Sequence, residues 1–499
     1  MGDDEDGGRS LDSLASISEG AGLFLIGKGV SNVFRFLTNI ILTRYLGTNL
    51  YGIYAYLNVV FSLFTVIARL GGSNSVLRYL PEYRENPRQR QAMLTLAYGT
   101  SVLASILVAV AIYFFAPLIS AYTLDDPLFI DILRTTAIII PFNTLSKITY
   151  AAFKGIERMD YNVAISSIIH PAFRLVFLGG GAVLGSALTG VAAGLIVTAV
   201  LTLLVALVVL IKKTDLGTVV RPTQEDAKQY YNFSLPLTFN QLGNFLYNRI
   251  DLLMVGFLLS GSEVGIYNVA VVISGVLVLP LTAFNQLFPT VASRLYHNDR
   301  NKELEQVYRS ITWIIFTVTL FPAIAMILYA QNILYVFGDQ FTQGALVLVL
   351  FTIAQMMNCL VGPSGYLLMM SDRQYLTLFN QLSSGLLNAI LNYVLILEYG
   401  FIGAAVATAC VLIMVNLLRL GEVWYLERIL PYDWSYLKPI TAGAIAATTM
   451  YLLTFVFEGF TILFVGSLLG GLAFVASLYL LGINERSLKV MKDAIPSGN

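Results

Sequence analysis

Tyr51-Gly52-Ile53-Tyr54 returns as Val264-Gly265-Ile266-Tyr267, at an offset of 213 residues. A second pair of segments keeps this spacing, since Thr189-Gly190-Val191-Ala192-Ala193 aligns with Ile402-Gly403-Ala404-Ala405-Val406. An offset that holds over about 140 residues indicates two copies of one folded unit. Membrane proteins built from two halves commonly hold a substrate between them and rock one half against the other. The duplication therefore favours a transporter.

The composition is that of a membrane protein. Hydrophobic residues make up 57% of the chain and charged residues 12%, about half the charged share of soluble proteins. A spanning helix needs about 20 mostly apolar residues. Candidate spans start near Gly20, Tyr51, Ala92, Leu128, Tyr161, Ala187, Tyr231, Gly265, Ser310, Phe341, Tyr375, Phe401, Leu437 and Gly459. We expect an all-α polytopic membrane protein with about 14 transmembrane helices, forming two pseudo-equivalent six-helix bundles plus a C-terminal helix pair.

These spans predict six segments. They are a cytoplasmic acidic tail (1–19), an N-terminal six-helix lobe (20–213), a cytoplasmic linker (214–228), a C-terminal six-helix lobe (229–430), an extra transmembrane helix pair (431–483) and a cytoplasmic tail (484–499).

The distribution of Lys and Arg predicts the orientation. Of the 30 Lys and Arg residues, 24 fall in alternate gaps or in the N-terminal tail, among them Arg69, Lys147 and Lys154. The opposite gaps hold only acids, such as Asp125 and Glu458. Because positive residues are retained on the cytoplasmic side, we expect a multi-pass protein of the cell membrane with both termini cytoplasmic.

Several other classes of protein receive no support. Cys359, Cys410, His170 and His297 show no metal or disulfide spacing, so we expect no metal and no cofactor. The net charge is zero, and nucleic-acid binding is not indicated. The outward gaps are too short for an outer domain that could carry chemistry, which argues against an enzyme. The chain is expected to act as a monomer.

Six basic residues remain within or at the ends of spans: Lys28, Arg35, Arg44, Arg134, Arg174 and Arg249. Those near the outer boundary can extend toward water, whereas Lys28, Arg35 and Arg174 lie deeper. On a helix Lys28 and Arg35 are about 20° apart, and Asn32 and Asn39 share their stripe. A stripe of this kind cannot face lipid. It either joins helices by hydrogen bonds or lines a hydrated, cationic cavity, and we expect the cavity.

The second copy also carries polar stripes. Asn240, Asn244, Asn248 and Asp251 lie within about 80° of one another on span seven, and Asn388 belongs to a four-residue repeat of polar side chains on span eleven. We expect one shared vestibule. Its predicted substrate-binding residues are Lys28, Asn32, Arg35, Asn39, Arg174, Asn240, Asn244, Asn248 and Asn388. Positive charge at the midplane favours an anionic substrate, and an anionic head with a long apolar tail, such as a lipid-linked phosphosugar, fits a basic cavity that opens to lipid.

Four sequence signatures then resemble those of a known family. They are Arg44-Tyr45-Leu46-Gly47-Thr48-Asn49-Leu50-Tyr51-Gly52-Ile53-Tyr54, Leu77-Arg78-Tyr79-Leu80-Pro81-Glu82, the segment from Asn248-Arg249-Ile250-Asp251 to Tyr267, and Gly155-Ile156-Glu157-Arg158-Met159. Together they resemble the polysaccharide-transport branch, the lipid-linked oligosaccharide flippases, of the multidrug/oligosaccharidyl-lipid/polysaccharide exporter superfamily. The resemblance covers Gly20 to Ile483 and implies two six-helix bundles around a central cavity.

The expected function is therefore a flippase that translocates an anionic lipid-linked oligosaccharide or polysaccharide repeat unit from the cytoplasmic to the outer leaflet by alternating access. Its partners are the lipid-linked glycan, membrane lipids and a coupling H⁺ or Na⁺. Two alternatives stay open: an ion-coupled multidrug or small-molecule antiporter, and a non-transporting membrane assembly factor. Asp251 either forms an ion pair with Arg35 or Arg249, binds the coupling ion, or is exposed at the outer surface.

Overall fold

The computed structural model describes residues 3–185, 187–298, 300–370 and 373–482, and every regular element in these ranges is a helix. The all-α fold class is thereby confirmed. The chain divides into two compact units between Gly265 and Ile266. The first unit spans Gly22–Gly265, and the second contains the chain from Ile266 onward together with the residues before Gly22.

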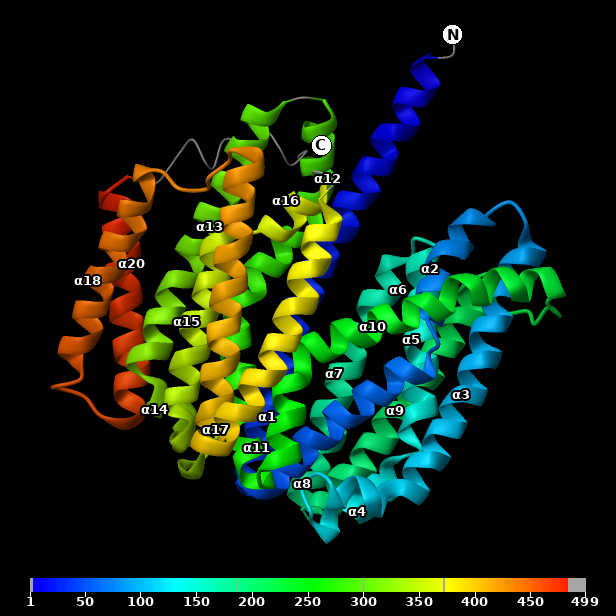
Figure 1. Cartoon of the computed structure of the whole chain (residues 1–499), viewed down its shortest axis with the longest axis horizontal. Helices are drawn as coiled ribbons and strands as arrows, with labels where there is room; N and C mark the ends of the chain where they lie inside the picture. The colour runs from blue at the N-terminus through cyan, green and yellow to red at the C-terminus, as the bar shows by residue number, and fades with distance from the viewer. Residues whose placement is uncertain (1–2, 186, 299, 371–372, 483–499) are drawn as a thin grey trace. The chain divides into compact units, whose positions relative to one another are not determined.

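The first unit is a helical bundle with α5 (Ile139–Gly155) at its centre. This helix packs against α2 (Gly72–Glu82), α3 (Pro87–Ala121) and α9 (Leu188–Lys213), as Figure 1 shows. The other helices are α1 (Asp3–Ala68), α4 (Pro127–Thr136), α6 (Met159–Val163), α7 (His170–Phe173), α8 (Gly179–Leu184) and α10 (Gln224–Leu258). Two π-helical turns, Ala164–Ile169 and Arg174–Leu178, join α6, α7 and α8 into one continuous span. The core between α2, α3 and α5 is apolar and aromatic.

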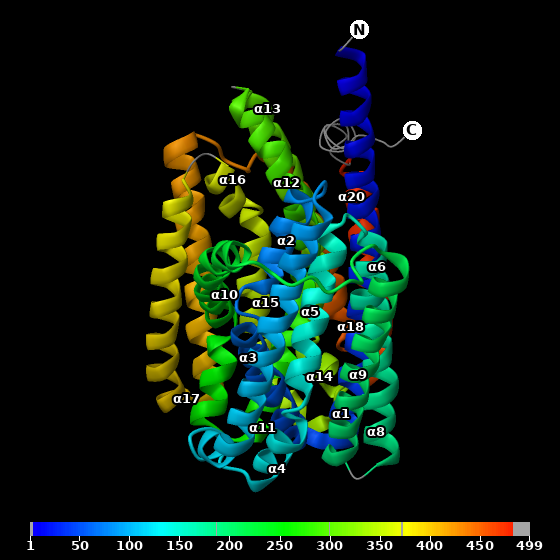
Figure 2. The same cartoon turned by 90° about the vertical axis from the view of Figure 1, so that its right-hand side faces the viewer.

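The long helix α10 crosses its neighbours rather than running along them. Its first part lies over α2 and α3, with which it makes contact (Figure 1), and in Figure 2 this part is seen nearly end-on. Pro236 lies inside α10, where a proline removes one backbone hydrogen bond and permits a bend. The bend explains how one helix both covers the bundle and leads down to α11 (Gly261–Ser274).

The second unit contains most of α11 and the helices that follow. They are α12 (Leu279–His297), α13 (Asn301–Leu328), α14 (Ala330–Tyr335), α15 (Ala345–Val361), α16 (Ser364–Met370), α17 (Gln374–Glu427), α18 (Leu437–Leu453), α19 (Gly459–Thr461) and α20 (Ser467–Leu480). Helix α15 packs between α13 and α17. Helices α18 and α20 pack on one another, and α18 packs on α13. This pair lies in the range for which the sequence predicted an extra helix pair.

Nine helices in the described ranges are long and apolar enough to cross a membrane, or up to ten with the bent pair α4–α5. Two of them are too long for one crossing, since Gly27–Ala68 has 42 residues and Tyr375–Glu427 has 53, and a 30 Å hydrocarbon core needs only about 20. Each contains one non-helical glycine, Gly47 and Gly400, at which two helices join. Helices α10 and α18 are not among the nine. The total of fourteen spans stays a prediction.

The helix boundaries repeat with the sequence offset. Helices α3 and α13 begin at residues 87 and 301, and α6 and α17 begin at 159 and 374. Helix α9 begins at Leu188, and the second arm of α17 follows Gly400. These starts differ by 214, 215 and 213 residues, in agreement with the offset of 213. The duplication found in the sequence is therefore a duplication of helices.

The boundary between the two units lies at residue 265, and the predicted lobes divide at residues 214–228. The difference arises because α10 packs on α2 and α3 of the first unit. A duplication boundary and a packing boundary need not coincide, since a helix can leave its own copy to cover the other. The predicted segment limits stay a prediction.

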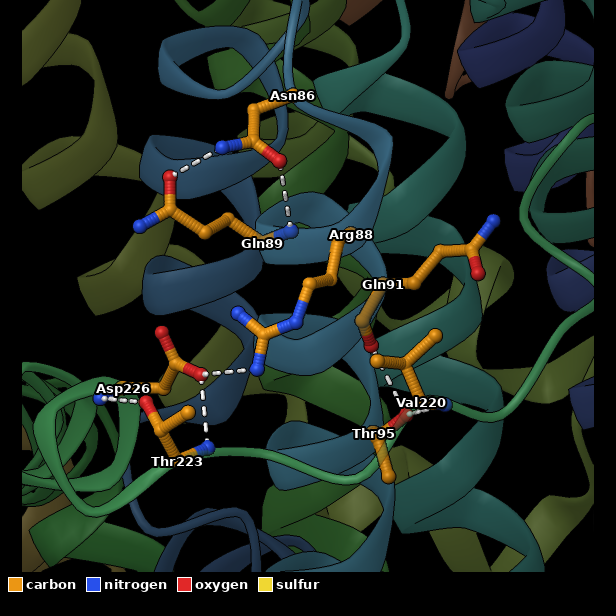
Figure 3. Close-up of polar contacts among 8 residues, drawn as sticks. All are labelled: Asn86, Arg88, Gln89, Gln91, Thr95, Val220, Thr223 and Asp226. Carbon is orange, nitrogen blue, oxygen red and sulfur yellow. Dashed lines mark hydrogen bonds and ion pairs between the residues drawn. The ribbon is translucent and has the colours of Figure 1, made fainter.

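The segment between α9 and α10 is fastened to the start of α3 (Figure 3). The Val220 backbone amide donates to Thr95 Oγ1 at 3.3 Å. Thr223 and Asp226 form a capping box at the start of α10, in which each side chain accepts a hydrogen bond from the backbone amide of the other. The Arg88 guanidinium lies 3.9 Å from the Asp226 carboxylate. The first turn of α10 is thus anchored by its own cap and by α3.

Candidate functional site: a basic cluster in the first unit

The cavity residues predicted on α1 lie in a group of positive charges. Arg35 interacts electrostatically with Arg174 and Arg249, and Lys28 interacts with Arg35 and Lys154. The Arg35 side chain is accessible to water, although protein atoms surround most of it. The structure therefore brings Lys28, Arg35 and Arg174 together.

Lys147 belongs to the same group. It lies on α5, and its charge interacts with Arg69, Arg35, Lys154 and Lys28. We call Lys28, Arg35, Lys147, Lys154, Arg174 and Arg249 the basic cluster; its members come from α1, α5, α10 and the π-helical turn after α7. The salt bridges of the described residues involve none of these six side chains.

The structure gives Arg69 and Lys147 surroundings that the sequence did not predict. Lys147 lies inside α5, eight residues before its end, and Arg69 follows α1 and precedes the 11-residue helix α2. The segment from Arg69 to Ser75 resembles a loop because it contains two glycines and three polar residues. Counting basic residues by gap therefore assigned both side chains to the cytoplasm. A signal for Lys147 was present, because Lys147 and Lys154 are seven residues apart, as are Lys28 and Arg35.

Arg174 is held by the duplicated sequence signature. Its Nη2 donates hydrogen bonds to the Tyr54 hydroxyl and to Asn58 Oδ1, the latter at 3.3 Å. Asn58 is fixed in turn, because its Nδ2 donates to the Tyr54 backbone oxygen at 2.7 Å. Tyr54 also interacts electrostatically with Arg35. The last tyrosine of Tyr51-Gly52-Ile53-Tyr54 thus orients a cation of the cluster.

The first tyrosine of this signature has a parallel role. The Tyr51 hydroxyl donates to Asn39 Oδ1 at 2.9 Å, and Asn39 Nδ2 donates to the Arg35 backbone oxygen at 2.9 Å. Gly52 lies between the two tyrosines, and a Cβ atom there would meet the Gly261 backbone oxygen at 1.7 Å. Only glycine permits this approach of α11. The signature therefore packs two helices together and positions polar side chains on two sides.

Asn32 completes the stripe on α1. Its Nδ2 is buried and has no hydrogen-bond partner among the described residues, and the side chain lies between Lys28 and Arg35 on the same helical face. A buried donor without a partner is costly. This amide is available to a ligand oxygen.

The asparagine stripe of α10 is accessible. Asn240, Asn244 and Asn248 are exposed, and each bonds along its own helix: Asn244 Nδ2 donates to Asn240 Oδ1 at 2.9 Å and Asn248 Nδ2 to the Asn244 backbone oxygen at 2.7 Å. Arg249 is exposed, whereas Asp251 is buried. Residues two apart on a helix do not face each other, so Arg249 and Asp251 point in different directions. Neither predicted ion pair of Asp251 is tested by these contacts, and both stay predictions.

Asn388 lies in a network of the second unit. Its Oδ1 accepts hydrogen bonds from Asn392 Nδ2 at 2.8 Å and from Thr408 Oγ1 at 3.3 Å. These bonds tie the two arms of α17 together and correspond to the helix-joining alternative that the sequence left open. Its predicted contact with a glycan stays a prediction. Asn380 lies about two helical turns before Asn388. Its Nδ2 donates to both carboxylate oxygens of Glu422, at 2.9 and 2.7 Å.

A cavity of about 820 Å³ lies on α17 beside this network. It is lined by Leu376 from the first arm and by residues from Cys410 to Leu426 of the second arm, including Glu422. Apart from Glu422 the lining is almost entirely apolar. Among the described residues no group of three His, Cys, Asp or Glu side chains could hold a metal ion. The basic cluster, in contrast, lies in the first unit.

Comparison with known proteins agrees with this architecture. The family model described as "Polysaccharide biosynthesis protein" matches residues 17–295, and the MatE model matches residues 236–394. Two relatives from Haloferax volcanii, "Probable low-salt glycan biosynthesis flippase Agl15" and "Probable flippase AglR", are each 29% identical, over 38% and 45% of this chain. The matched parts make up 40% and 46% of those relatives, so the chain spans less than half the length of either.

Solved structures share the fold at low sequence identity. "Lipid II flippase MurJ, inward closed conformation" superposes with a TM-score of 0.73 at 18% identity, over 92% of this chain and 98% of that one. A MATE multidrug transporter in the inward-facing conformation gives 0.63 at 15% identity, over 80% and 94%. At these identities the likeness shows a common fold and nothing more. Because the first family model covers more than half of its residues, the chain belongs to the polysaccharide biosynthesis protein family.

Proposed function

We propose that this protein is a flippase that moves an anionic lipid-linked oligosaccharide or polysaccharide repeat unit from the cytoplasmic to the outer leaflet by alternating access. The basic cluster is the observation that carries this proposal. Each cation at membrane depth costs at least ~2.5 kcal/mol on the most lenient scale, and the salt bridges identified among the described residues are formed by other side chains than the six of the basic cluster. Such charges are retained where an anion passes.

The roles of the side chains follow from their chemistry. Lys28, Arg35 and Arg174 contact the phosphate or the acidic sugars, and Tyr54 and Asn58 keep the Arg174 guanidinium in place. Amides are suited to glycan hydroxyls, because an amide both donates and accepts. The amides assigned to this role are Asn32, Asn39, Asn240, Asn244, Asn248 and Asn388. The protein catalyses no covalent step in this scheme.

The relatives support the glycan as cargo. Two of them are named as flippases, one specifically in glycan biosynthesis, and a structural neighbour is named as a flippase for lipid II. Alternating access follows from the duplication, since transporters of this kind rock one half against the other around a central site. The membrane lipids surround the protein, which acts as a monomer with both termini cytoplasmic.

Energy coupling is assigned to Asp251. This carboxylate is buried in α10, and it either pairs with Arg35 or Arg249 when the cavity is empty or binds a coupling H⁺ or Na⁺. An ion pair would be released when the anionic substrate replaces the carboxylate.

A leaflet assay tests the flippase proposal. The full-length protein is depleted in cells that make it, and lipid-linked glycans are oxidised by membrane-impermeant periodate in right-side-out and inside-out vesicles. Depletion should move the lipid-linked glycan to the cytoplasmic leaflet, and restoring the protein should return it to the outer leaflet. An unchanged distribution of every lipid-linked glycan between the leaflets would contradict the proposal.

An ion-coupled multidrug or small-molecule antiporter is the second candidate. It is favoured by the MatE match at residues 236–394. Such a protein would expel cationic drugs, and depletion would raise their accumulation while lipid-linked glycans kept their leaflet. Because cationic drugs are attracted by carboxylates and the cluster of the first unit is basic, we expect drug accumulation to stay unchanged.

A further inference from the structure

The second span of the first unit is broken inside the bundle. Helix α1 ends at Ala68, Leu70 and Gly71 have φ angles of 46° and 71°, and α2 begins at Gly72. A Cβ atom at Gly71 would lie 2.0 Å from the Ser234 backbone oxygen of α10, so both the positive φ and the contact require glycine there. The break is therefore a fixed feature of the packing.

Other helices enclose the break. The Ser101 hydroxyl of α3 donates to the Arg69 backbone oxygen at 3.3 Å. A Cβ atom at Gly72 would lie 3.0 Å from Ile148 Cδ1 of α5 and 2.9 Å from the Tyr230 hydroxyl of α10. Helices α3, α5 and α10 thus surround residues 69–72. Broken helices in transporters are tolerated where the freed backbone lines a site.

Two cations meet at this break. Arg69 is largely enclosed by protein, and its Nε donates to the Thr65 backbone oxygen at 3.3 Å. Arg69 is the strongest electrostatic neighbour of Lys147, the residue next to Ile148 on α5. The salt bridges of the described residues include neither side chain. Two like charges held near each other repel, and an anion between them would reduce the repulsion.

Unpartnered hydroxyls accompany the two cations. Ser73, in the first turn of α2, is 8% exposed, and Ser146, beside Lys147, is 5% exposed. The hydroxyl oxygens of both are buried and have no hydrogen-bond partner among the described residues. The backbone amides of Gly72, Asn74 and Ser75 already donate to the Arg69 and Gly71 carbonyl oxygens, so the side chains supply the contacts to an anion. Cations and free hydroxyls are groups with which proteins bind phosphate.

We infer that the break between α1 and α2 is a phosphate-binding site formed by Arg69, Lys147 and the Ser73 hydroxyl. Lys147 interacts with Arg35 as well as with Arg69, so the site is adjacent to the basic cluster. The phosphate comes either from the lipid-linked substrate, which rests on the proposed function, or from free inorganic phosphate. In the first case the site holds the head group at a position distinct from the contact with Arg35 and Arg174.

Thermal unfolding of the full-length protein in detergent tests the site. Inorganic phosphate and dodecyl phosphate are titrated at constant ionic strength against wild type, Arg69→Gln and Lys147→Gln. Arg78→Gln is the matched control, because Arg78 is an exposed cation of the same helix α2. We expect both anions to raise the Tm of wild type and of Arg78→Gln. The apparent Kd should be about tenfold weaker in Arg69→Gln and in Lys147→Gln.

The Tm of the anion-free protein distinguishes a phosphate-binding role of Arg69 and Lys147 from a purely structural role. Removing one of two repelling charges should leave the Tm of the anion-free protein unchanged or raise it. An anion-free Tm that falls in both variants, with an unchanged response to phosphate, would overturn the inference. A tighter response to dodecyl phosphate than to inorganic phosphate identifies the lipid head group as the ligand, and equal responses identify free phosphate.

Failure of the site and failure of the flippase proposal are distinguishable. If the leaflet assay shows glycan translocation but phosphate binding is independent of Arg69 and Lys147, only this inference is lost. If phosphate binding depends on both residues but no glycan changes leaflet, the site stands with free phosphate as its ligand, and the flippase proposal is lost.

Discussion

The change Tyr54→Phe removes one hydroxyl group from the centre of the basic cluster. Tyr54 is 5% exposed and its hydroxyl accepts a hydrogen bond from Arg174. Phenylalanine keeps the ring and its packing, so the change acts on this bond alone. The Arg174 guanidinium would then be held only by Asn58 Oδ1 at 3.3 Å. The Tyr54→Phe variant therefore measures how much Tyr54 contributes to the basic cluster through Arg174.

The magnitude follows from the kind of bond that is lost. A hydrogen bond to a charged group contributes ~1.5–3 kcal/mol, and each 1.4 kcal/mol corresponds to a tenfold change. We expect the translocation rate to fall at least tenfold at low substrate concentration, because Arg174 is then free to leave the orientation in which it meets the anion. The Arg174→Gln variant, which removes the charge itself, should fall further.

The assay is glycan translocation in vesicles from cells that carry each variant, normalised to protein in the membrane. Tyr56→Phe is the control, because Tyr56 lies on the same helix and its hydroxyl bonds to the Leu253 backbone oxygen at 3.5 Å and to the Thr123 side chain, not to a member of the basic cluster. That variant should transport normally. Wild-type rates for Tyr54→Phe, together with loss of transport in Arg174→Gln, would refute the orienting role of Tyr54.

Three further predictions follow from the structure. Thr223→Ala removes one bond of the capping box of α10, which contributes about 1 kcal/mol. In a protein of 499 residues the Tm should then fall by about 1 °C in thermal unfolding, and an unchanged Tm would show that Asp226 and Arg88 suffice. If Asp251 couples an ion, Asp251→Asn should abolish ion-driven transport and leave substrate binding intact. If Asp251 forms an ion pair with Arg35, the double change Arg35→Asp with Asp251→Arg should rescue transport. Normal transport by Asp251→Asn under every ion gradient would exclude both roles. Cysteines introduced at Ser262 and Glu458 should react with impermeant reagents from outside, those at Asn86 and Asn301 should not, and outside labelling at Asn86 would overturn the predicted orientation.

Most of what could be predicted about the fold from the sequence came from the duplication. The offset of 213 residues returns in the starts of α3 and α13 and of α9 and the second arm of α17, because helix boundaries follow hydropathy and hydropathy was copied with the unit. The packing of α10 on α2 and α3 was not predictable. It depends on contacts such as that of Gly71 with Ser234, which are 163 residues apart, and no local pattern specifies them.

The site was predicted in part. Lys28, Arg35 and Arg174 were recognisable because each interrupts an apolar stretch, and they do lie together. Arg69 and Lys147 were missed, since a broken helix and the end of a span look like loops when hydropathy alone is considered. Tyr54 and Asn58 were missed as partners of Arg174 because their role depends on which helices are neighbours. A buried tyrosine in an apolar span has many structural explanations until its partner is known.

Charge reversal in the basic cluster tests whether an anionic head group passes along it. Glycan translocation is measured for Lys28→Glu and Arg35→Glu, with Lys213→Glu as control, because Lys213 is an exposed cation at the end of α9. If an anionic head group passes along the cluster, both reversals should abolish translocation while the proteins remain in the membrane at wild-type levels, and Lys213→Glu should transport normally. Full translocation by both Lys28→Glu and Arg35→Glu would contradict the account.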